Sequence, residues 1–232
     1  AHGCGTYHAA DYDELIDHPV EMGRFSHATF EACGVPHEIV ITGRHDCDMS
    51  RLCRDLKRIC EWQIRFFGEP APMSRYVFLV TAVGDGYGGL EHRASTALLC
   101  SRNDLPYSGM TDQPESYRTF LGLCSHEYFH SWLVKFIRPE NFVNYDLNKE
   151  GYTSLLWIFE GFTSYYDDLI LLRSGVIHQD SYLILLKAQI DRYLQNPGRL
   201  VQSVSESSFD AWVKFYRQDE NSNNAGTSYY NK

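Results

Sequence analysis

The sequence of 232 residues lacks several features that would have assigned it to a class directly. No apolar run reaches the roughly 18 residues of a membrane-spanning helix, because "SLLWIFEGF" and "YLILLKAQI" are short and broken by charge. Basic residues are not in excess: the formal net charge is -9, which argues against a nucleic-acid partner. There is no internal repeat, and Ala1–Thr6 does not contain the apolar h-region of a signal peptide.

Paired cysteine motifs are also missing, although seven cysteines are present. None falls in a C-x-x-C pair, and the odd number favours free thiols in a reducing compartment, so we expect a cytoplasmic location. The alternative is a small zinc cluster, formed by His2, Cys4 and His8 or by His45 and Cys47. Neither set has the spacing that is typical of zinc ligands.

What the first half does contain is a mixture of strand and helix patterns. Hydrophobic residues make up 44% of the chain and charged residues 22%, as in an ordinary globular protein. Residues 48–69 predict an amphipathic helix, opened by Asp48 or Ser50 and closed by Gly68. Strands are predicted at 37–45, 75–83 and 94–102, and the glycine-rich stretch 85–92 predicts a turn between the last two.

The second half is mainly helical in its periodicity. Long helices are predicted over Pro114–Phe136, Tyr152–Ser174 and Gln179–Gln195, with Asp112 as a candidate N-cap of the first. A further short helix is predicted over 207–218 and a polar loop over 219–228. Strands followed by helices indicate an α+β fold, with a sheet-rich N-terminal lobe and a mainly helical C-terminal lobe.

The stretch "CSHEYFHSWLVKF", Cys124–Phe136, carries two histidines four residues apart. Four residues of an α-helix turn through about 400°, so His126 and His130 would project from nearly the same face and could share one metal ion. Glu127, rotated by about 100° from His126, could reach a water on that metal without replacing a ligand. The alternative is a core helix with two hydrogen-bonded histidines.

A catalytic zinc site needs a third protein ligand and an open position. Glu160 is the candidate, because it lies in the strongly apolar stretch "LLWIFEGF", where a carboxylate is costly unless it is paired or binds a metal. Ser164 and Asp167 follow on the same helical face, and Asp167 is preferred as the group that orients a ligating histidine. The alternative for Asp167 is a solvated carboxylate beside Asp168.

Together, "HEYFHSWLVKFIRP" and "LWIFEGFTSYYDDLILLRSG" resemble the glycyl aminopeptidase family of gluzincin metallopeptidases, which are related to aminopeptidase N. The resemblance extends to "DYDELIDHPVEMG", "YGGLEHRASTALL" and "SYYNK". It implies a thermolysin-like catalytic domain spanning 1–232. It also implies an N-terminal β domain before this region and helical and PDZ-like regions after it, so we expect the chain to be a fragment.

The resemblance further assigns roles that spacing does not give. Glu91 would bind the free α-amino group of a substrate, and the backbone around Gly88 and Gly89 would pair with the peptide along an edge strand. Tyr230, rather than Tyr229, would donate a hydrogen bond to the oxyanion, because it lies two residues before Lys232. We expect Leu90 to face the core and Glu91 to face the cleft.

The resulting hypothesis is a zinc aminopeptidase that acts on peptides with a free N-terminus and with glycine or another small residue in first position. One Zn²⁺ per chain would be held by His126, His130 and Glu160, with Glu127 as general base. Two alternatives are a zinc endopeptidase, which would not need Glu91, and a catalytically inactive peptide-binding module. The sequence does not determine the oligomeric state.

Overall fold

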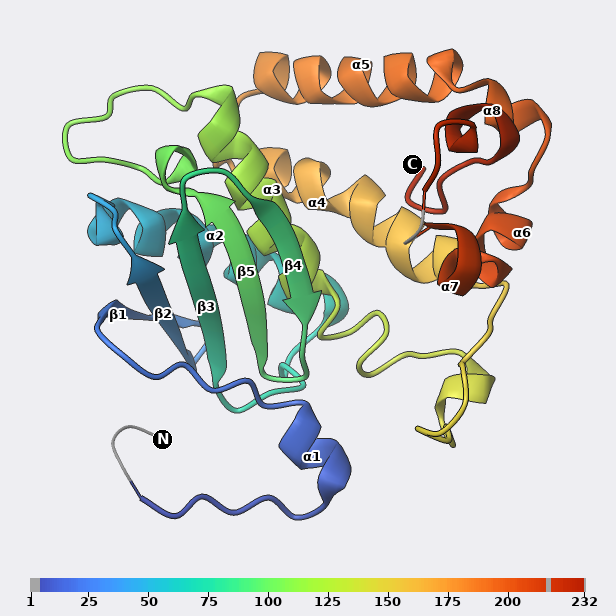
Figure 1. The fold of residues 1–232 in the computed structure, drawn as a ribbon. Helices are drawn as coiled ribbons and strands as arrows, with labels where there is room; N and C mark the ends of the chain where they lie inside the picture. Colours follow the sequence, from blue (N-terminus) through green and yellow to red (C-terminus); the bar gives the residue numbers. More distant parts are fainter. Residues whose placement is uncertain (1–4, 216–217, 232) are drawn as a thin grey trace.

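A computed structural model of the chain describes residues 5–215 and 218–231. One five-stranded sheet lies in the N-terminal half, and most of the helices follow it (Figure 1). The strands are β1 (Phe25–Ala32), β2 (Val35–Gly43), β3 (Tyr76–Val83), β4 (Tyr87–Glu91) and β5 (Ser95–Ser101). The α-helices are α1 (Tyr12–Ile16), α2 (Met49–Phe67), α3 (Glu115–Phe129), α4 (Phe162–Arg173), α5 (Gln179–Gln195), α6 (Val204–Phe209), α7 (Ala211–Lys214) and α8 (Ser222–Ala225).

The sheet has the strand order β1-β2-β3-β5-β4, so that β4 forms one edge. Strands β2, β3 and β5 run parallel, and the hairpins β1–β2 and β4–β5 are antiparallel. Helix α2 makes the crossover from β2 to β3 on the face that carries α3 (Figure 1). Short helical turns complete the chain at η1 (Arg102–Asp104), η2 (Glu140–Phe142), η3 (Trp157–Gly161, a π-helical turn) and η4 (Pro197–Leu200).

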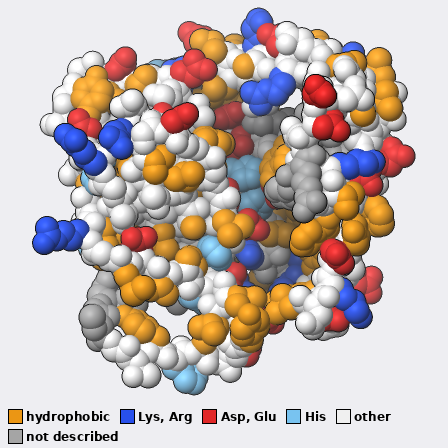
Figure 2. Space-filling view, viewed as in Figure 1, with side chains coloured by type: hydrophobic (Ala, Val, Ile, Leu, Met, Phe, Trp, Pro, Cys, Tyr) orange, Lys and Arg blue, Asp and Glu red, His pale blue; other side chains and the backbone are white. Residues whose placement is uncertain are grey.

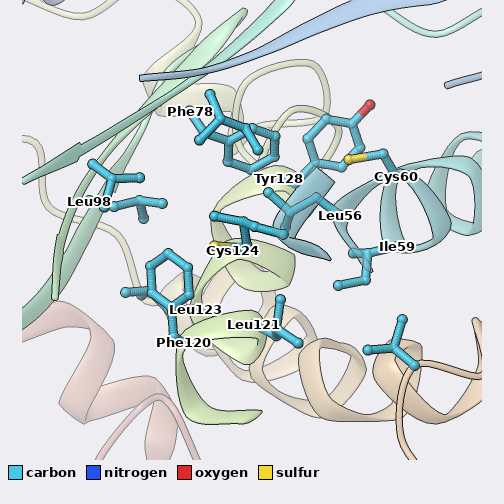
Figure 3. Close-up of a cluster of buried hydrophobic side chains, with 14 of the residues drawn as sticks. Leu56, Ile59, Cys60, Phe78, Leu98, Phe120, Leu121, Leu123, Cys124 and Tyr128 are labelled. Atoms are coloured by element: carbon cyan, nitrogen blue, oxygen red, sulfur yellow. The ribbon is translucent and has the colours of Figure 1, made fainter. Parts of the chain in front are cut away.

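The core lies between the inner face of the sheet and helices α2 and α3. Figure 3 shows how side chains from α2, β3, β5 and α3 meet there. The labelled side chains are Leu56, Ile59, Cys60, Phe78, Leu98, Phe120, Leu121, Leu123, Cys124 and Tyr128. Because α3 is covered by the sheet on one side and by α4 on another, almost every residue of its second half is buried. This burial places any polar group on α3 in a low-dielectric environment.

Several predicted elements agree with the structure. Helix α2 begins after Asp48, whose side chain accepts the Arg51 N–H, and ends at Gly68, whose φ of 97° suits glycine. Helix α5 has the predicted bounds. The three predicted strands are found as β2, β3 and β5, and the arrangement of a sheet-rich N-terminal half before a helical half is confirmed.

Other boundaries differ from the prediction. Helix α3 starts after Pro114 rather than Asp112, and it stops at Phe129, because the chain turns sharply after His130. Residues 152–155 are not a helix, and the Trp157 N–H donates to the Ser208 hydroxyl at 3.0 Å where the π-helical turn begins.

The remaining corrections concern three short segments. The predicted helix over 207–218 is split into α6 and α7 at Asp210, and Tyr216 and Arg217 lie outside the described residues. The predicted polar loop over 219–228 contains α8. The stretch 85–92 is not simply a turn, because Tyr87–Glu91 forms strand β4, as the family resemblance implies.

The cysteines within the described residues are free thiols, and they are Cys33, Cys47, Cys53, Cys60, Cys100 and Cys124. Among the described residues, His45 and Cys47 belong to no group of three or more potential metal ligands, and His45 Nδ1 instead accepts the Cys47 backbone N–H at 3.2 Å. His2 and Cys4 lie outside the described residues. None of the helices in the described ranges combines the length and apolar content that crossing a membrane requires.

Candidate metal centre

The two histidines lie at the C-terminal end of α3. His126 belongs to its last turn, and His130 caps the helix in a helical conformation, donating its backbone N–H to the His126 carbonyl at 3.3 Å. Both side chains are almost fully buried. Their ring centroids are 4.7 Å apart and their Nε2 atoms 3.1 Å apart. The spacing of four residues therefore brings the two imidazoles to one point, as the sequence predicts.

Glu160 approaches this point from the π-helical turn η3. Its Oε2 lies 3.2 Å from Nε2 of His126 and 3.4 Å from Nε2 of His130. Extra residues in a π-helical turn shift the side chains that follow and are frequent at functional sites. The three side chains thus offer two nitrogens and one carboxylate oxygen, all within 4.8 Å of one another.

The proton positions in this cluster follow from the outer ring nitrogens. Nδ1 of His126 lies 3.3 Å from Asp167 Oδ2, and Nδ1 of His130 lies 2.8 Å from the Leu133 carbonyl. Both partners are acceptors, so each Nδ1 must carry the proton and each neutral ring presents the Nε2 lone pair inward. Two lone pairs then face each other and the carboxylate of Glu160.

Such a convergence of lone pairs is unfavourable unless a cation lies among them. Two imidazole nitrogens and one carboxylate are a common protein ligand set of catalytic zinc, and an outer hydrogen bond from each histidine is typical of metal ligands. The side chains present therefore fit a zinc ion. These three side chains would supply three of the four ligands of a tetrahedral zinc ion, so the fourth position stays available for water or substrate.

Without a metal, the same cluster would attract a proton. Burial lowers the pKa of His126, but the carboxylates of Asp167 and Glu160 outweigh it and raise this pKa to about 10. Burial raises the pKa of Glu160, but the two histidines hold it well below its usual range. The two shifts reflect one interaction, the attraction between a histidine cation and the Glu160 carboxylate, which stabilises the charged form of each.

Glu127, the candidate general base, lies beside this cluster and is buried. It is 5% exposed, and within the described residues its Oε2 has no hydrogen-bond partner. Burial raises its pKa to about 7, while His126 and His130 oppose the shift. A carboxylate with a pKa near neutrality can both accept and release a proton, as a general base requires.

The edge strand β4 passes directly over Glu127. A Cβ added to Gly89 would lie 2.1 Å from Glu127 Oε1, whereas one added to Gly88 would meet no atom within 4 Å. Gly89 is therefore required by the close approach of the strand to the carboxylate. The sequence suggested only that a peptide backbone could approach these glycines, and the contact with Glu127 is a second reason.

Glu91 ends strand β4 on the same face as Gly89. It pairs with Thr96 and Gly89 pairs with Leu98, both of which point to the buried face of β5. An oxygen of Glu91 falls in one group with Glu127 and His130, with ligand atoms within 4.8 Å of one another. Leu90 does face the opposite way, but toward the outside, where it is 57% exposed, so its predicted place in the core is wrong.

The C-terminal tyrosine segment also lies near the cluster. The Tyr230 ring lies 6.1 Å from the His126 ring, whereas Tyr229 is buried and packs on Phe215. Tyr230, the tyrosine that the family resemblance selects, thus has its ring near His126, and its role at the oxyanion stays a prediction. Lys232, the residue by which the resemblance selects Tyr230, lies outside the described residues.

Gly161 permits this approach and was not recognised from the sequence. A Cβ at Gly161 would lie 3.2 Å from the carbonyl oxygens of Tyr229 and Asn231. The glycine next to Glu160 therefore lets the tyrosine segment lie against the π-helical turn. A glycine directly after a candidate ligand was the available signal, but it did not reveal which segment packs there.

Of the two candidates for orienting a histidine, Asp167 is the one that reaches His126. Ser164 is buried on the same helix, but within the described residues it makes no hydrogen bond to either histidine. His130 is instead oriented by the Leu133 carbonyl, which no side-chain motif could have indicated.

The space-filling view shows a hollow between two parts of the surface, with histidine side chains on its floor and acidic side chains beside them (Figure 2). His126 is 8% exposed, so part of the cluster is accessible from outside. In the view of Figure 1, the hollow lies between edge strand β4 and the C-terminal helices.

Comparison with known proteins gives a matching family model and similar solved structures. Residues 119–232 match the family model of M61 glycyl aminopeptidase. A crystal structure of an aminopeptidase N family protein from Idiomarina loihiensis is similar, with 50% sequence identity and a TM-score of 0.94. That match covers 96% of this chain and 38% of the other, so this chain spans well under half the length of that relative. None of the curated proteins matches.

Proposed function

We propose that this chain, which belongs to the M61 glycyl aminopeptidase family, is a zinc-dependent aminopeptidase catalytic domain. In this proposal the fold is the thermolysin-like domain of the gluzincins. The substrates are peptides with a free N-terminus, and glycine or another small residue is the preferred first residue. The six described free thiols support a cytoplasmic location.

The observation that carries the proposal is the convergence of three lone-pair donors beside a buried carboxylate. His126, His130 and Glu160 would hold one zinc ion. When bound, zinc lowers the pKa of a coordinated water towards about 7 and polarises the scissile carbonyl. Asp167 and the Leu133 carbonyl keep the two histidines in the tautomers that this binding needs.

Glu127 is the general base in this proposal. Its unpartnered Oε2 removes a proton from the attacking water and later delivers that proton to the departing amine. Strand β4, through Gly89, limits where the carboxylate can lie. Tyr230, whose ring lies 6.1 Å from that of His126, donates a hydrogen bond to the substrate oxygen on which negative charge develops.

Glu91 makes the site an exopeptidase. A free α-amine is a cation at neutral pH, and a carboxylate placed about one residue from the scissile carbonyl can bind it. Glu91 shares the inner face of β4 with Gly89 and lies close to both Glu127 and His130. The free edge of β4 offers backbone N–H and carbonyl groups, around Gly88 and Gly89, to an extended peptide.

The endopeptidase alternative uses the same zinc chemistry without Glu91. The position of Glu91 beside the base favours the aminopeptidase, since a charge there would not help to bind the middle of a chain. The inactive binding module would be favoured by loss of a ligand or of the base, and all four side chains are present.

Hydrolysis of matched peptides with free and N-acetylated termini tests the proposal. The Glu91→Ala variant should lose about 2 to 4 kcal/mol in kcat/KM for the free-amine peptide and little for the acetylated one. Its zinc content should be unchanged. Equal losses on both peptides would make Glu91 structural and would favour the endopeptidase.

A further inference from the structure

An ionic cluster lies at the end of strand β4, next to the candidate zinc site. Its centre is Lys135, whose ammonium lies 3.3 Å from Asp17 Oδ1 and 4.0 Å from Glu91 Oε1. The side chains of Lys135 and Glu91 are each 23% exposed, and that of Asp17 is 10% exposed. The three residues are far apart in the sequence, so only the fold brings them together.

Asp17 is firmly held in this cluster. Its Oδ2 accepts the backbone N–H of Arg93 at 2.9 Å and lies 3.7 Å from the Arg93 side chain, while His92 Nδ1 lies 3.6 Å from its other oxygen. Burial would raise the pKa of Asp17, but these contacts and Lys135 hold it well below its usual range. Asp17 is therefore a fixed anion, and the Lys135 ammonium forms an ion pair with it.

The backbone of Lys135 is also held in place. Its N–H donates to the His130 carbonyl at 3.1 Å, and the Val134 N–H donates to the Ile137 carbonyl at 3.0 Å. Val134 has a φ of 101°, a conformation that a β-branched residue rarely adopts. This tight turn directly after His130 directs Lys135 back toward β4, and such local strain persists only where surrounding contacts maintain it.

We propose that Lys135, held by Asp17, is a positioning residue that orients the Glu91 carboxylate toward the α-ammonium group of the substrate. A carboxylate can accept about four hydrogen bonds, so Lys135 on one oxygen leaves the other free for a second ammonium. Fixing one oxygen removes rotamer freedom that substrate binding would otherwise have to restrict. The inference rests on the proposed role of Glu91 and extends it to residues that no motif indicated.

A purely structural role for the cluster is the competing explanation. Lys135 would then join the segment after α3 to the segment after α1, and its loss would affect all ligands alike. The two explanations differ in whether the effect depends on a free amine. The test therefore compares ligands that differ only in that group.

The experiment measures inhibition and turnover in the zinc-loaded protein. The ligand pair is glycine hydroxamate and N-acetylglycine hydroxamate, and turnover is followed on peptides with a free N-terminus. For Lys135→Met, which keeps the length of the side chain, KM and the Ki of glycine hydroxamate should each rise about tenfold, as expected for the loss of one coupled ionic contact. The acetylated inhibitor should bind as before, and kcat should change less than twofold.

Three further variants complete the test. Lys135→Arg should restore most of the affinity for the free amine, and Asp17→Asn should give the Lys135→Met pattern in weaker form. Lys149→Met, at an exposed lysine paired with Asp146, is the control and should leave both constants unchanged. In the Glu91→Ala background, Lys135→Met should have no further effect, because it acts through Glu91.

Equal loss of both hydroxamates, a fall in kcat, or failure of Lys135→Met to fold would overturn the inference in favour of a structural role. Tighter binding of glycine hydroxamate would also overturn it, since Lys135 would then compete with the substrate. If Glu91→Ala itself affects both inhibitors equally, the proposed function fails. If only Glu91→Ala discriminates between them, the inference about Lys135 fails alone.

Discussion

Gly89→Ala is a small change that should remove activity without removing the metal. The added methyl group would lie 2.1 Å from Oε1 of Glu127, 2.5 Å from Cδ and 2.7 Å from Cγ. An ordinary contact needs at least 3.4 Å, so the difference between 2.1 and 3.4 Å requires a shift of 1.3 Å. The backbone of Gly89 does not lie in the left-handed region, so the substitution is limited by this contact alone.

The expected loss follows from that displacement. A misplacement of about 1 Å of a catalytic group costs on the order of 10²-fold in rate, or about 2.7 kcal/mol in transition-state stabilisation. Overpacking of the carboxylate should also lower the free energy of unfolding by about 1 to 3 kcal/mol. The three atoms nearest to the new methyl group all belong to Glu127 and not to a candidate zinc ligand, so zinc content should stay the same.

Steady-state hydrolysis of a free-amine peptide, with elemental analysis of the same preparations, measures both quantities. Gly84→Ala is the matched control, because a Cβ at Gly84 meets no atom within 4 Å and the glycine precedes the same strand. Near-normal turnover of Gly89→Ala would refute the reasoning, since Glu127 could then leave its position without consequence. Loss of zinc would also contradict it.

Three further variants test other parts of the site and the core. Glu127→Gln should lower turnover by about 10² to 10⁴ and retain zinc, as measured by hydrolysis and elemental analysis. Gly161→Ala should displace the tyrosine segment and lower kcat severalfold with zinc unchanged, and a normal kcat would show that the segment adapts. Burial lowers the pKa of His37 from 6.5 to about 4, so the unfolded chain binds more protons in that window. Stability should fall by about 3 kcal/mol from pH 6.5 to 4, and His37→Gln should remove this slope in denaturant titrations.

The sequence was sufficient to predict those elements whose ends are marked by residues within the element or next to it. Helix α2 has a capping aspartate and a closing glycine, and its buried residues repeat at helical spacing. The convergence of His126 and His130 follows from spacing on one helix. In both cases the information lies within a few residues of the feature.

Boundaries set by distant contacts could not be predicted in this way. The π-helical turn begins where Ser208 accepts the Trp157 N–H, and α3 ends where the Leu133 carbonyl turns toward His130. The outward position of Leu90 depends on the register of β4 against β5. A strand at the sheet edge can expose an apolar side chain that the same pattern would bury in the centre.

Contacts between different elements of the site could not be predicted either, because they join residues that are distant in the sequence. Gly89 and Glu127 are 38 positions apart in the sequence and belong to a strand and a helix. Lys135 lies 118 positions from Asp17. The motifs named the groups that we propose as catalytic, but the residues that contact those groups became visible only in the fold.

Zinc stoichiometry is the measurement that tests the central claim most directly. Elemental analysis of the purified protein should give one zinc per chain, and adding zinc to metal-stripped protein should raise its melting temperature. Glu160→Gln keeps the size of the side chain but removes the charge, so its zinc affinity should fall. If the protein contains no zinc and added zinc does not change its melting temperature, His126, His130 and Glu160 are not a zinc site.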